Sequence, residues 1–191
     1  MTGTSKKEQT HERILRSAAR AIRQEGYQGV SVADIMKDAG LTHGGFYAHF
    51  PSREALLAES LEAAAAESMH SLQEAIRKAP TDKGLEALLD TYLSDAHAKH
   101  PERGCSLAAL GSETRRQSGE VRSVTTEQVR RMLELLEGQL PAGAADQRQE
   151  QALAALSTMV GALLISRAVN DSKLAQSFRT AAKRAVSNKR R

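Results

Sequence analysis

Residues 31–50 read SVADIMKDAGLTHGGFYAHF, and this stretch decides the fold. Ser31, with Asp34 three residues later, matches a capping box and predicts that a helix begins here. Gly40 allows a tight turn after this helix, and Thr42 can cap a second helix at His43–His49. The proline that follows this stretch disfavours helix at the residue before it, so the second helix is short. The stretch therefore predicts a helix-turn-helix.

The second helix of this motif contains two adjacent glycines, Gly44 and Gly45. A glycine inside a helix costs about 1 kcal/mol relative to alanine, so the pair indicates a purpose other than helix stability. One such purpose is a close approach of the backbone to another surface. The helix also offers polar side chains, at Thr42, His43, Tyr47 and His49. A helix of this kind can lie in the major groove, so the motif at 31–50 predicts DNA binding.

Helical periodicity also describes the rest of the chain. Within Glu8–Glu25, apolar residues recur every fourth position at Ile14, Ala18 and Ile22. Further helices are expected at Arg53–Lys78, Lys83–Ala98, Gly104–Gln117, Glu120–Leu140, Asp146–Asn170 and Lys173–Ser187. No segment shows the alternation typical of a strand. The expected fold is all-α, with about nine helices: a three-helix DNA-binding domain and a helical C-terminal ligand-binding and dimerisation domain.

Composition limits the location and partners of the protein. The 191 residues are 40% hydrophobic and 3% aromatic, with a formal net charge of +4. The first 60 residues hold eight Lys/Arg and seven Asp/Glu, so attraction to phosphate must come from where the charges sit. The longest strongly apolar run, Met159–Ile165, is far shorter than the roughly 20 residues that span a bilayer. We therefore expect a cytoplasmic protein with no membrane partner.

A longer stretch, residues 13–57, reads RILRSAARAIRQEGYQGVSVADIMKDAGLTHGGFYAHFPSREALL and resembles the DNA-binding domain of the TetR family of repressors. The elements that carry the resemblance are Gly26-Tyr27, Val32-x-x-Ile35, Ala39-Gly40-Leu41, Gly44-x-x-Tyr47-x-His49-Phe50 and Arg53-x-x-Leu56-Leu57. The match runs from about Glu8 to Ser68 and departs at Ile22, where the family often has phenylalanine. The resemblance implies a DNA-binding domain at 8–68 and a helical regulatory and dimerisation domain at 69–191.

The resemblance also implies roles for individual residues. The Tyr47 hydroxyl should contact a backbone phosphate, and Thr42 should contact phosphate or cap the recognition helix. Phosphates on either side should be held by Ser31, His49 and Arg53. Base edges should face His43, Gly44 and Gly45. Other readings remain open, because Tyr47 could be part of the core, His49 could cap its own helix, and Arg53 could be a surface charge.

The C-terminal part has a helix that is apolar on nearly all sides, at Ala152–Ala168. Such a helix must be buried on several sides, which a symmetric dimer interface would achieve. An ordinary core helix in a monomer is the alternative. The resemblance further implies an inducer pocket among the middle helices. Apolar and polar residues that could line it include Met69, Leu72, Leu88, Tyr92, Leu107, Leu110, Met132 and Leu136, although plain core packing explains each equally well.

The single cysteine, Cys105, follows Arg103-Gly104 at an expected helix start. A helix N-terminus stabilises a thiolate, so Cys105 could react with an oxidant or electrophile. The alternative is that Cys105 packs as a small hydrophobe. We therefore name Cys105, Tyr92 and Met132 as candidates for ligand or redox sensing.

These features favour one class of function over others. The sequence predicts a transcriptional repressor that is released from a palindromic operator by a small-molecule or reactive-species inducer. A transcriptional activator or a helical protein-interaction module remains the alternative. Motifs of enzymes such as G-x-S-x-G, a phosphate loop and H-E-x-x-H are missing, so no catalytic activity is expected. His97-x-x-His100 with Cys105 is a weak metal signal, and neither a metal nor another cofactor is expected.

Overall fold

The computed structural model describes residues 5–141 and 144–188 of the chain. These residues form nine α-helices and two 3₁₀-helices, with no strand among them, so the all-α expectation is confirmed. The elements are α1 (Lys6–Glu25), α2 (Val32–Asp38), η1 (His43–Ala48), α3 (Arg53–Lys78), α4 (Gly84–Tyr92), α5 (Asp95–Lys99), η2 (Pro101–Arg103), α6 (Ser106–Thr114), α7 (Gly119–Glu137), α8 (Ala145–Ala168) and α9 (Ser172–Asn188).

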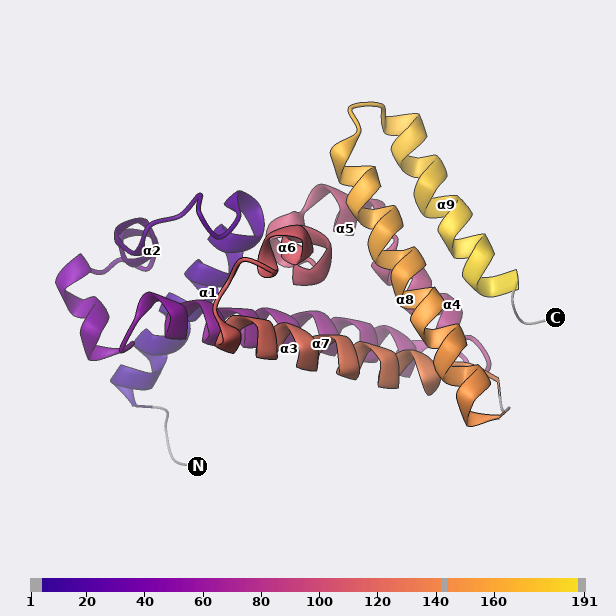
Figure 1. The fold of residues 1–191 in the computed structure, drawn as a ribbon, viewed down its shortest axis with the longest axis horizontal. Helices are drawn as coiled ribbons and strands as arrows, with labels where there is room; N and C mark the ends of the chain where they lie inside the picture. The colour runs from indigo at the N-terminus through magenta and orange to yellow at the C-terminus, as the bar shows by residue number, and fades with distance from the viewer. Residues whose placement is uncertain (1–4, 142–143, 189–191) are drawn as a thin grey trace.

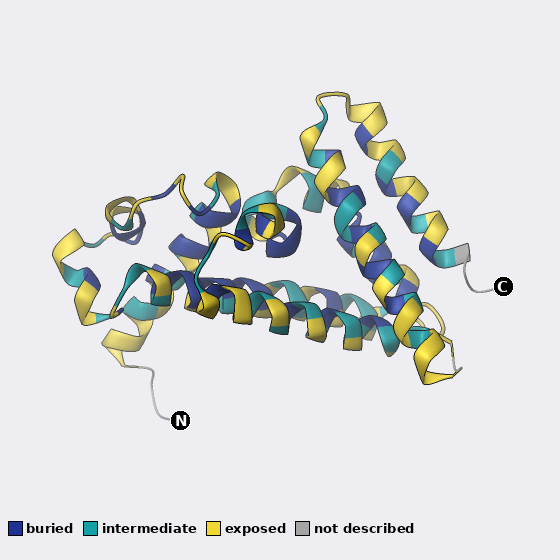
Figure 2. Cartoon of the chain, viewed as in Figure 1, coloured by how far each residue is buried: buried dark blue, intermediate teal, exposed yellow. Residues whose placement is uncertain are grey.

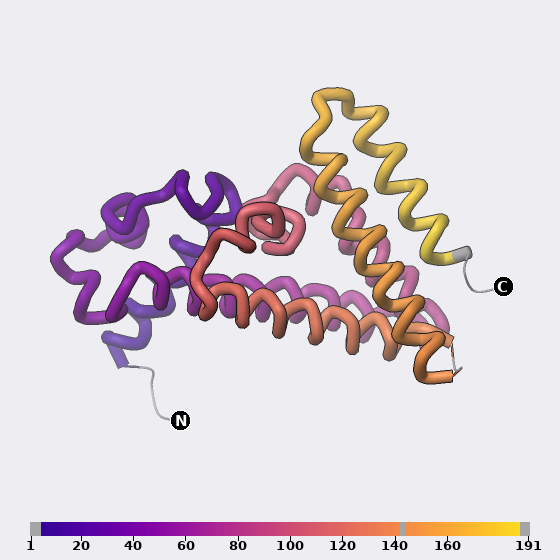
Figure 3. Tube along the Cα trace, in the orientation of Figure 1, coloured from indigo at the N-terminus to yellow at the C-terminus, as the bar shows by residue number. Residues whose placement is uncertain are grey.

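Two pairs of long helices set the shape of the molecule (Figure 1). Helices α3 and α7 pack side by side along its length. Helices α8 and α9 form an antiparallel pair at one end, and α7 packs against α8 (Figure 3). Helix α1, helix α2 and η1 occupy the opposite end, where α1 packs on α3. The helix-turn-helix therefore lies far from the C-terminal helix pair.

Local sequence signals place the elements of the helix-turn-helix. Ser31 caps α2 in a reciprocal capping box with Asp34, as the sequence predicts. Gly40 adopts a φ of +70°, a conformation that residues with a Cβ rarely adopt, and it makes the turn before η1. Phe46 and Phe50 are buried and stack at a ring-centroid distance of 5.7 Å, so they anchor η1 on the core.

The structure corrects four details of the sequence-based expectation. The helix expected at Lys83–Ala98 is two helices, α4 and α5, because the Ser94 side chain caps a new helix by accepting from the His97 N–H at 3.0 Å. The helix expected at Gly104–Gln117 is α6, which begins at Ser106 after the short η2. The second helix of the motif is a 3₁₀-helix, which two adjacent glycines and the nearby proline favour over a full α-helix. The Thr42 side chain makes no capping hydrogen bond.

The buried residues form two hydrophobic clusters that meet along α3. One fills the C-terminal part, and its members come mainly from α4, α6, α7, α8 and α9. The other lies under the helix-turn-helix and includes Leu110 from α6 and Val121 from α7. The sequence-based boundary between residues 68 and 69 falls inside α3, which continues unbroken through it. The helix-turn-helix end and the C-terminal part therefore share α3, and α6 and α7 contribute to the cluster under the helix-turn-helix.

Candidate nucleic-acid interface and ligand cavity

The polar face of the helix-turn-helix is open to solvent. Tyr47 is 74% exposed, the highest value among the large hydrophobic side chains, while its neighbour Phe46 is buried beneath it. Thr42, His43 and Gly44 are also exposed. Exposed residues therefore line the outer edge of the molecule at η1, at the end opposite α8 and α9 (Figure 2). The structure thus brings the expected base-facing residues and two expected phosphate contacts together on one segment.

The two glycines of η1 have no structural requirement within the protein. Neither has a positive φ, since the glycines in that region are Gly26 and Gly40. A Cβ built on Gly44 meets no atom within 4 Å, and one on Gly45 meets only the Met36 side-chain terminus, at 3.7 Å. Neither backbone conformation nor internal packing therefore accounts for glycine at these positions. A partner that approaches the backbone of η1 from outside would account for it.

Two of the expected phosphate contacts are engaged inside the protein. The Ser31 hydroxyl donates to the Asp34 carboxylate at 2.5 Å and accepts from the Asp34 N–H at 3.1 Å. The Ser31 hydroxyl and the Ser31 backbone N–H, at 3.2 Å, both donate to the Asp34 carboxylate, and these two hydrogen bonds lower the pKa of that carboxyl. The Arg53 Nη2 donates to the carbonyl of Tyr27 and, at 3.5 Å, to that of Val30. Arg53 therefore braces the loop between α1 and α2, a role that the sequence analysis missed.

His49 is half-buried beside the second cluster, and its buried Nδ1 has no hydrogen-bond partner among the residues that the structure describes. Burial lowers the pKa of its imidazole, and the nearby His11 and Lys7 lower it further. The His11 ring stacks on Phe50 at a centroid distance of 4.5 Å, and its Nε2 lies 2.8 Å from the Glu59 carboxylate. His49 is thus a neutral group at neutral pH, able to donate one hydrogen bond.

A cavity of about 340 Å³, which we call the α3–α7 cavity, lies between α3, the α4–α5 region, the start of α6, and the middle of α7. It brings together the three sensing candidates, Tyr92, Cys105 and Met132. Its lining residues are Ala65, Ser68, Met69, Ser71, Leu72, Thr91, Tyr92, Ser94, Ala96, His97, His100, Arg103, Gly104, Cys105, Gln128 and Met132. Other pocket candidates, including Leu88, Leu110 and Leu136, are buried in the two clusters instead.

The cysteine and a histidine meet at the wall of this cavity. Cys105 is the N-cap residue of α6 and is only 2% exposed. Its backbone N–H donates to the His97 Nε2 at 2.9 Å, so the ring proton sits on Nδ1, which donates to the Tyr92 carbonyl at 2.5 Å. Burial lowers the pKa of His97 to about 4, which keeps the ring uncharged. Within the described residues, no group of three His, Cys, Asp or Glu side chains could hold a metal ion.

A buried arginine connects this wall to the DNA-binding end. Arg23, in the last turn of α1, is 3% exposed. Its Nη1 donates to the Gly104 carbonyl at 2.9 Å, and its Nη2 donates to the Glu67 carboxylate at 3.1 Å. In the peptide bond between Gly104 and Cys105, the carbonyl therefore accepts a hydrogen bond from Arg23 of α1, and the N–H donates one to His97. The sequence carried no signal for this contact beyond an arginine at the end of an amphipathic helix.

The helix pair α8 and α9 leaves apolar side chains uncovered. Leu153, Leu164 and Ile165 on α8 and Leu174 on α9 are exposed large hydrophobic residues. By length and composition α8 could cross a membrane, which the sequence analysis did not anticipate. In this structure α8 packs against α6, α7 and α9. Most of its apolar side chains therefore lie in the protein interior, and Leu153, Leu164 and Ile165 are the large exposed ones named above.

Comparison with known proteins identifies the family. Residues 14–60 match the family model described as bacterial regulatory proteins of the TetR family. Residues 80–182, more than half of the chain, match the tetracyclin repressor-like C-terminal domain. This chain belongs to the TetR family. It is therefore a DNA-binding transcriptional regulator.

Relatives and solved structures of the family agree with this assignment. The chain is 25% identical to the HTH-type transcriptional regulator LmrA of Bacillus subtilis over 85% of this chain and 89% of that protein. It is 29% identical to an uncharacterized HTH-type regulator of Mycobacterium tuberculosis over 84% and 85% of the two chains. A TetR-family regulator from Cytophaga hutchinsonii superposes with a TM-score of 0.84 at 18% identity, covering 98% of each chain. Reduced E. coli NemR superposes with a TM-score of 0.80 at 22% identity, covering 94% of this chain and 96% of that one.

The variant Gly44→Ala should affect DNA binding without lowering stability. Because a Cβ at Gly44 would stand in open space, Gly44→Ala should unfold in urea at the wild-type concentration or above it. The same methyl group would stand between the backbone of η1 and DNA, so we expect a loss of operator affinity of roughly tenfold or more in a gel-shift titration.

Gly40→Ala is the matched control for this test. Its φ of +70° penalises a side chain, so this variant should lose about 1–2 kcal/mol of unfolding free energy. A Gly44→Ala variant that is destabilised as much as Gly40→Ala, or that binds operator normally, would contradict the external role of Gly44.

Proposed function

We propose that this TetR-family protein is a transcriptional repressor that binds a partly palindromic operator as a homodimer and is released by a small molecule in the α3–α7 cavity. The observation that carries the proposal is the exposed face of η1, where Tyr47 and two structurally unrequired glycines lie together. A cytoplasmic location follows from the partner, since operator DNA is chromosomal. No enzymatic activity is part of the proposal. Activation of transcription is the alternative that a reporter assay distinguishes.

The contacts divide into those that position the protein and those that read sequence. We assign phosphate contacts to Tyr47 and Thr42, which are exposed, and to His49, whose buried Nδ1 has no hydrogen-bond partner among the described residues. Ser31 and Arg53 stay in this set, and each must share its polar atoms with Asp34 or with the loop carbonyls. His43 is the candidate for a base-edge donor. Gly44 and Gly45 permit the approach of the backbone to the groove.

This division predicts different phenotypes for two neighbouring variants. Tyr47→Phe removes a phosphate hydrogen bond, so binding should weaken roughly tenfold on operator and scrambled DNA alike. His43→Ala removes a base-edge donor, so it should lose about 1–3 kcal/mol on the preferred operator and little on scrambled DNA. Gel shifts with upstream intergenic DNA and a scrambled duplex provide both measurements. Equal losses on both duplexes for His43→Ala would show that His43 does not read bases.

The homodimer part of the proposal rests on the uncovered apolar face of α8 and α9. Leu164 is 41% exposed, and Leu153, Ile165 and Leu174 on the same helix pair are exposed as well. Large exposed apolar residues that gather on one helix pair indicate an interaction site. A two-fold dimer through this face would present two η1 segments to successive major grooves about 34–36 Å apart. A single helix-turn-helix could contact only one half-site.

A charge on this face should therefore abolish the dimer. Leu164→Glu should sediment as a monomer at concentrations at which the wild type is a dimer, because a carboxylate cannot be buried in an apolar interface without a partner. Its far-UV spectrum should be unchanged, since Leu164 is already exposed to solvent in the single chain. Thr126→Glu, on the exposed side of α7, is the control and should remain dimeric. A dimeric Leu164→Glu variant would place the interface elsewhere.

Release of DNA requires a connection between the cavity and the DNA-binding end. We assign this connection to the Gly104–Cys105 peptide bond, whose N–H is held by His97 at the cavity wall and whose carbonyl is held by Arg23 of α1. A ligand that displaces His97 would move this peptide bond. Movement of the peptide would then alter the hydrogen bond that fixes the end of α1. Reaction of an electrophile with Cys105, at the same peptide bond, is a second way to move it.

The proposed connection can be measured without a ligand. In a double-mutant cycle, the destabilisations caused by Arg23→Lys and His97→Ala should deviate from additivity by about 0.5 kcal/mol or more, because both side chains bond one peptide unit. Lysine keeps the charge beside Glu67 but loses the planar fork of donors. Arg20→Lys, on the exposed side of α1, should combine additively with His97→Ala. Additive effects for Arg23 and His97 would refute the connection.

A further inference from the structure

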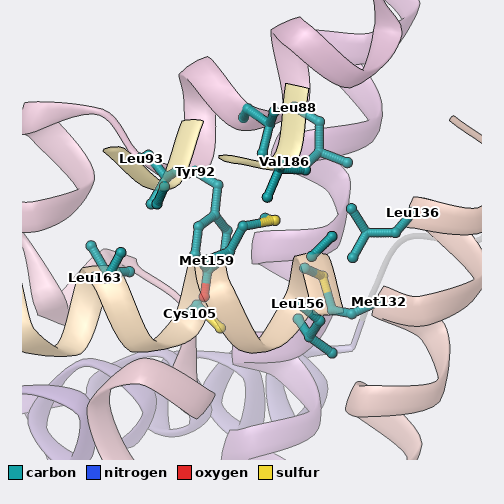
Figure 4. Packing of buried hydrophobic residues seen from close by; sticks show 14 of the residues in the cluster. Leu88, Tyr92, Leu93, Cys105, Met132, Leu136, Leu156, Met159, Leu163 and Val186 are labelled. Atoms are coloured by element: carbon teal, nitrogen blue, oxygen red, sulfur yellow. The ribbon is translucent and has the colours of Figure 1, made fainter. Parts of the chain in front are cut away.

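The α3–α7 cavity contains a hydrogen-bond donor without a partner. Tyr92 is 2% exposed, and its hydroxyl has no hydrogen-bond partner in the described part of the chain. Figure 4 shows the hydroxyl pointing at the Cys105 sulfur, whose side-chain contact with the hydroxyl helps to raise the Tyr92 pKa but falls short of a hydrogen bond of ordinary geometry. Burial raises the pKa of Tyr92 well above its usual value, so the group stays protonated and can donate. An unsatisfied buried hydroxyl is unfavourable, and a bound acceptor would relieve it.

Positive charge exceeds negative charge around the cavity. Its lining contains no Asp or Glu, and at its edge the Glu102 carboxylate lies 3.2 Å from the His100 Nδ1 and 3.7 Å from the Arg103 Nε, so it offsets the charge there. Behind His97 lies the half-buried Arg167, whose Nη2 donates to the His97 carbonyl at 2.7 Å and whose Nη1 has no partner. Burial lowers the pKa of Arg167, and its position near Tyr92 places a positive field at the polar end of the cavity. A cationic ligand would meet Arg167 with no carboxylate in the lining, and the Glu102 carboxylate acts on Arg167 only from outside the lining.

The remaining wall is apolar and adaptable. Two methionines, Met69 and Met132, line it together with Leu72 and small alanines. Methionine side chains adjust to ligands of different outline. A dry cavity of about 150 Å³ holds one benzene ring, so a space of about 340 Å³ fits a body of about two rings. Polar recognition is thus concentrated at the Tyr92 end, and shape recognition is distributed over the rest.

We propose that the cavity binds a compact apolar molecule through an oxygen acceptor, the oxygen of a carbonyl or carboxylate group, which receives the Tyr92 hydroxyl, and that it rejects cations. The inference rests on the proposed function, because it names the class of molecule that would act as inducer. Carbonyl compounds and carboxylates share the same acceptor chemistry. The neutral and the anionic form of that acceptor are therefore separate arms of the test.

The proposal can be tested with four compounds that share a naphthalene ring system and differ only in the polar group attached to it. The probes are 2-acetonaphthone with a neutral acceptor, 2-naphthoate with an anionic acceptor, 2-ethylnaphthalene with no acceptor, and 2-naphthylmethyl-trimethylammonium with a cation. Calorimetric titration of the full-length protein should give the tightest binding for one or both of the two acceptors. The ethyl compound should bind roughly five- to tenfold more weakly, and the cation should not bind.

The variant Tyr92→Phe identifies the donor. It removes one oxygen that has no partner in the folded protein, so the variant should fold with at least wild-type stability. It should bind the preferred acceptor roughly five- to tenfold more weakly and bind 2-ethylnaphthalene unchanged. Tyr27→Phe is the matched control, because the Tyr27 hydroxyl is also buried but bonds Thr114 at 3.1 Å outside the cavity. Its affinity for all four probes should equal that of the wild type.

Three outcomes would overturn the inference: binding of the cation as tight as that of the acceptors, unchanged acceptor affinity in Tyr92→Phe, or no binding of either acceptor. The proposed function is tested separately by adding the bound acceptor to the protein–operator complex. Acceptor binding without operator release would leave the ligand class standing and refute its role as inducer. Failure of the protein to bind operator at all would refute the proposed function while leaving the calorimetric result valid.

Discussion

The DNA-binding end of this protein cannot bury its own apolar faces, and its packing on α3, α6 and α7 is the constraint on which the rest depends. Helix α2 and η1 are each a few residues long, too short to be stable by themselves. Tyr27, Phe46 and Phe50 share their buried cluster with Leu110 of α6 and Val121 of α7. The orientation of η1 is thus fixed by the same helices that surround the cavity. A change at the start of α6 therefore has a physical route to the DNA-binding face.

Buried arginines perform a second structural task. Segments without regular structure leave carbonyl groups that need donors, and a guanidinium supplies five N–H groups in a fixed plane. Arg53 donates to carbonyls of the loop before α2, and Arg23 donates to the Gly104 carbonyl. Arg167 donates to carbonyls near the end of α5. Arg53 and Arg23 reach from a helix to a loop, whereas Arg167 reaches from α8 to the last turn of the short helix α5. The loops that adjoin the cavity and the DNA-binding face are consequently held by side chains from distant parts of the sequence.

The two regions that we propose as binding sites differ in the groups that they present. The η1 face presents exposed groups on a segment whose glycines leave its backbone accessible, which suits the continuous surface of a duplex. The cavity presents one unpartnered hydroxyl and an excess of positive charge within an apolar wall, which suits a small molecule with one polar end. Between them stands the Gly104–Cys105 peptide bond. Its two hydrogen bonds point in opposite directions, one toward each region.

The sequence by itself determined the helix-turn-helix, its capping box at Ser31, the turn at Gly40 and the all-α class. These features depend on neighbouring residues, so a linear pattern is sufficient to specify them. The residues at the wall of the cavity were only partly predictable: Tyr92, Cys105 and Met132 were identified, whereas His97 and Gln128 were not. Lining residues and core residues share the same apolar periodicity, because a helix face looks alike whether it meets another helix or a space.

Only the tertiary structure decided which polar atoms are left without partners. Local signals placed Ser31 and Arg53 among the phosphate contacts, but their hydrogen bonds to Asp34 and to the Tyr27 carbonyl became visible only in the folded chain. The unpartnered hydroxyl of Tyr92 depends on the absence of acceptors from several helices at once. The sequence therefore determined the helix-turn-helix and predicted the residues that would meet DNA, and the tertiary structure decided the chemistry of the cavity. The physical reason is that local order follows from residues a few positions apart, whereas the environment of a buried polar atom is set by segments that meet only after folding.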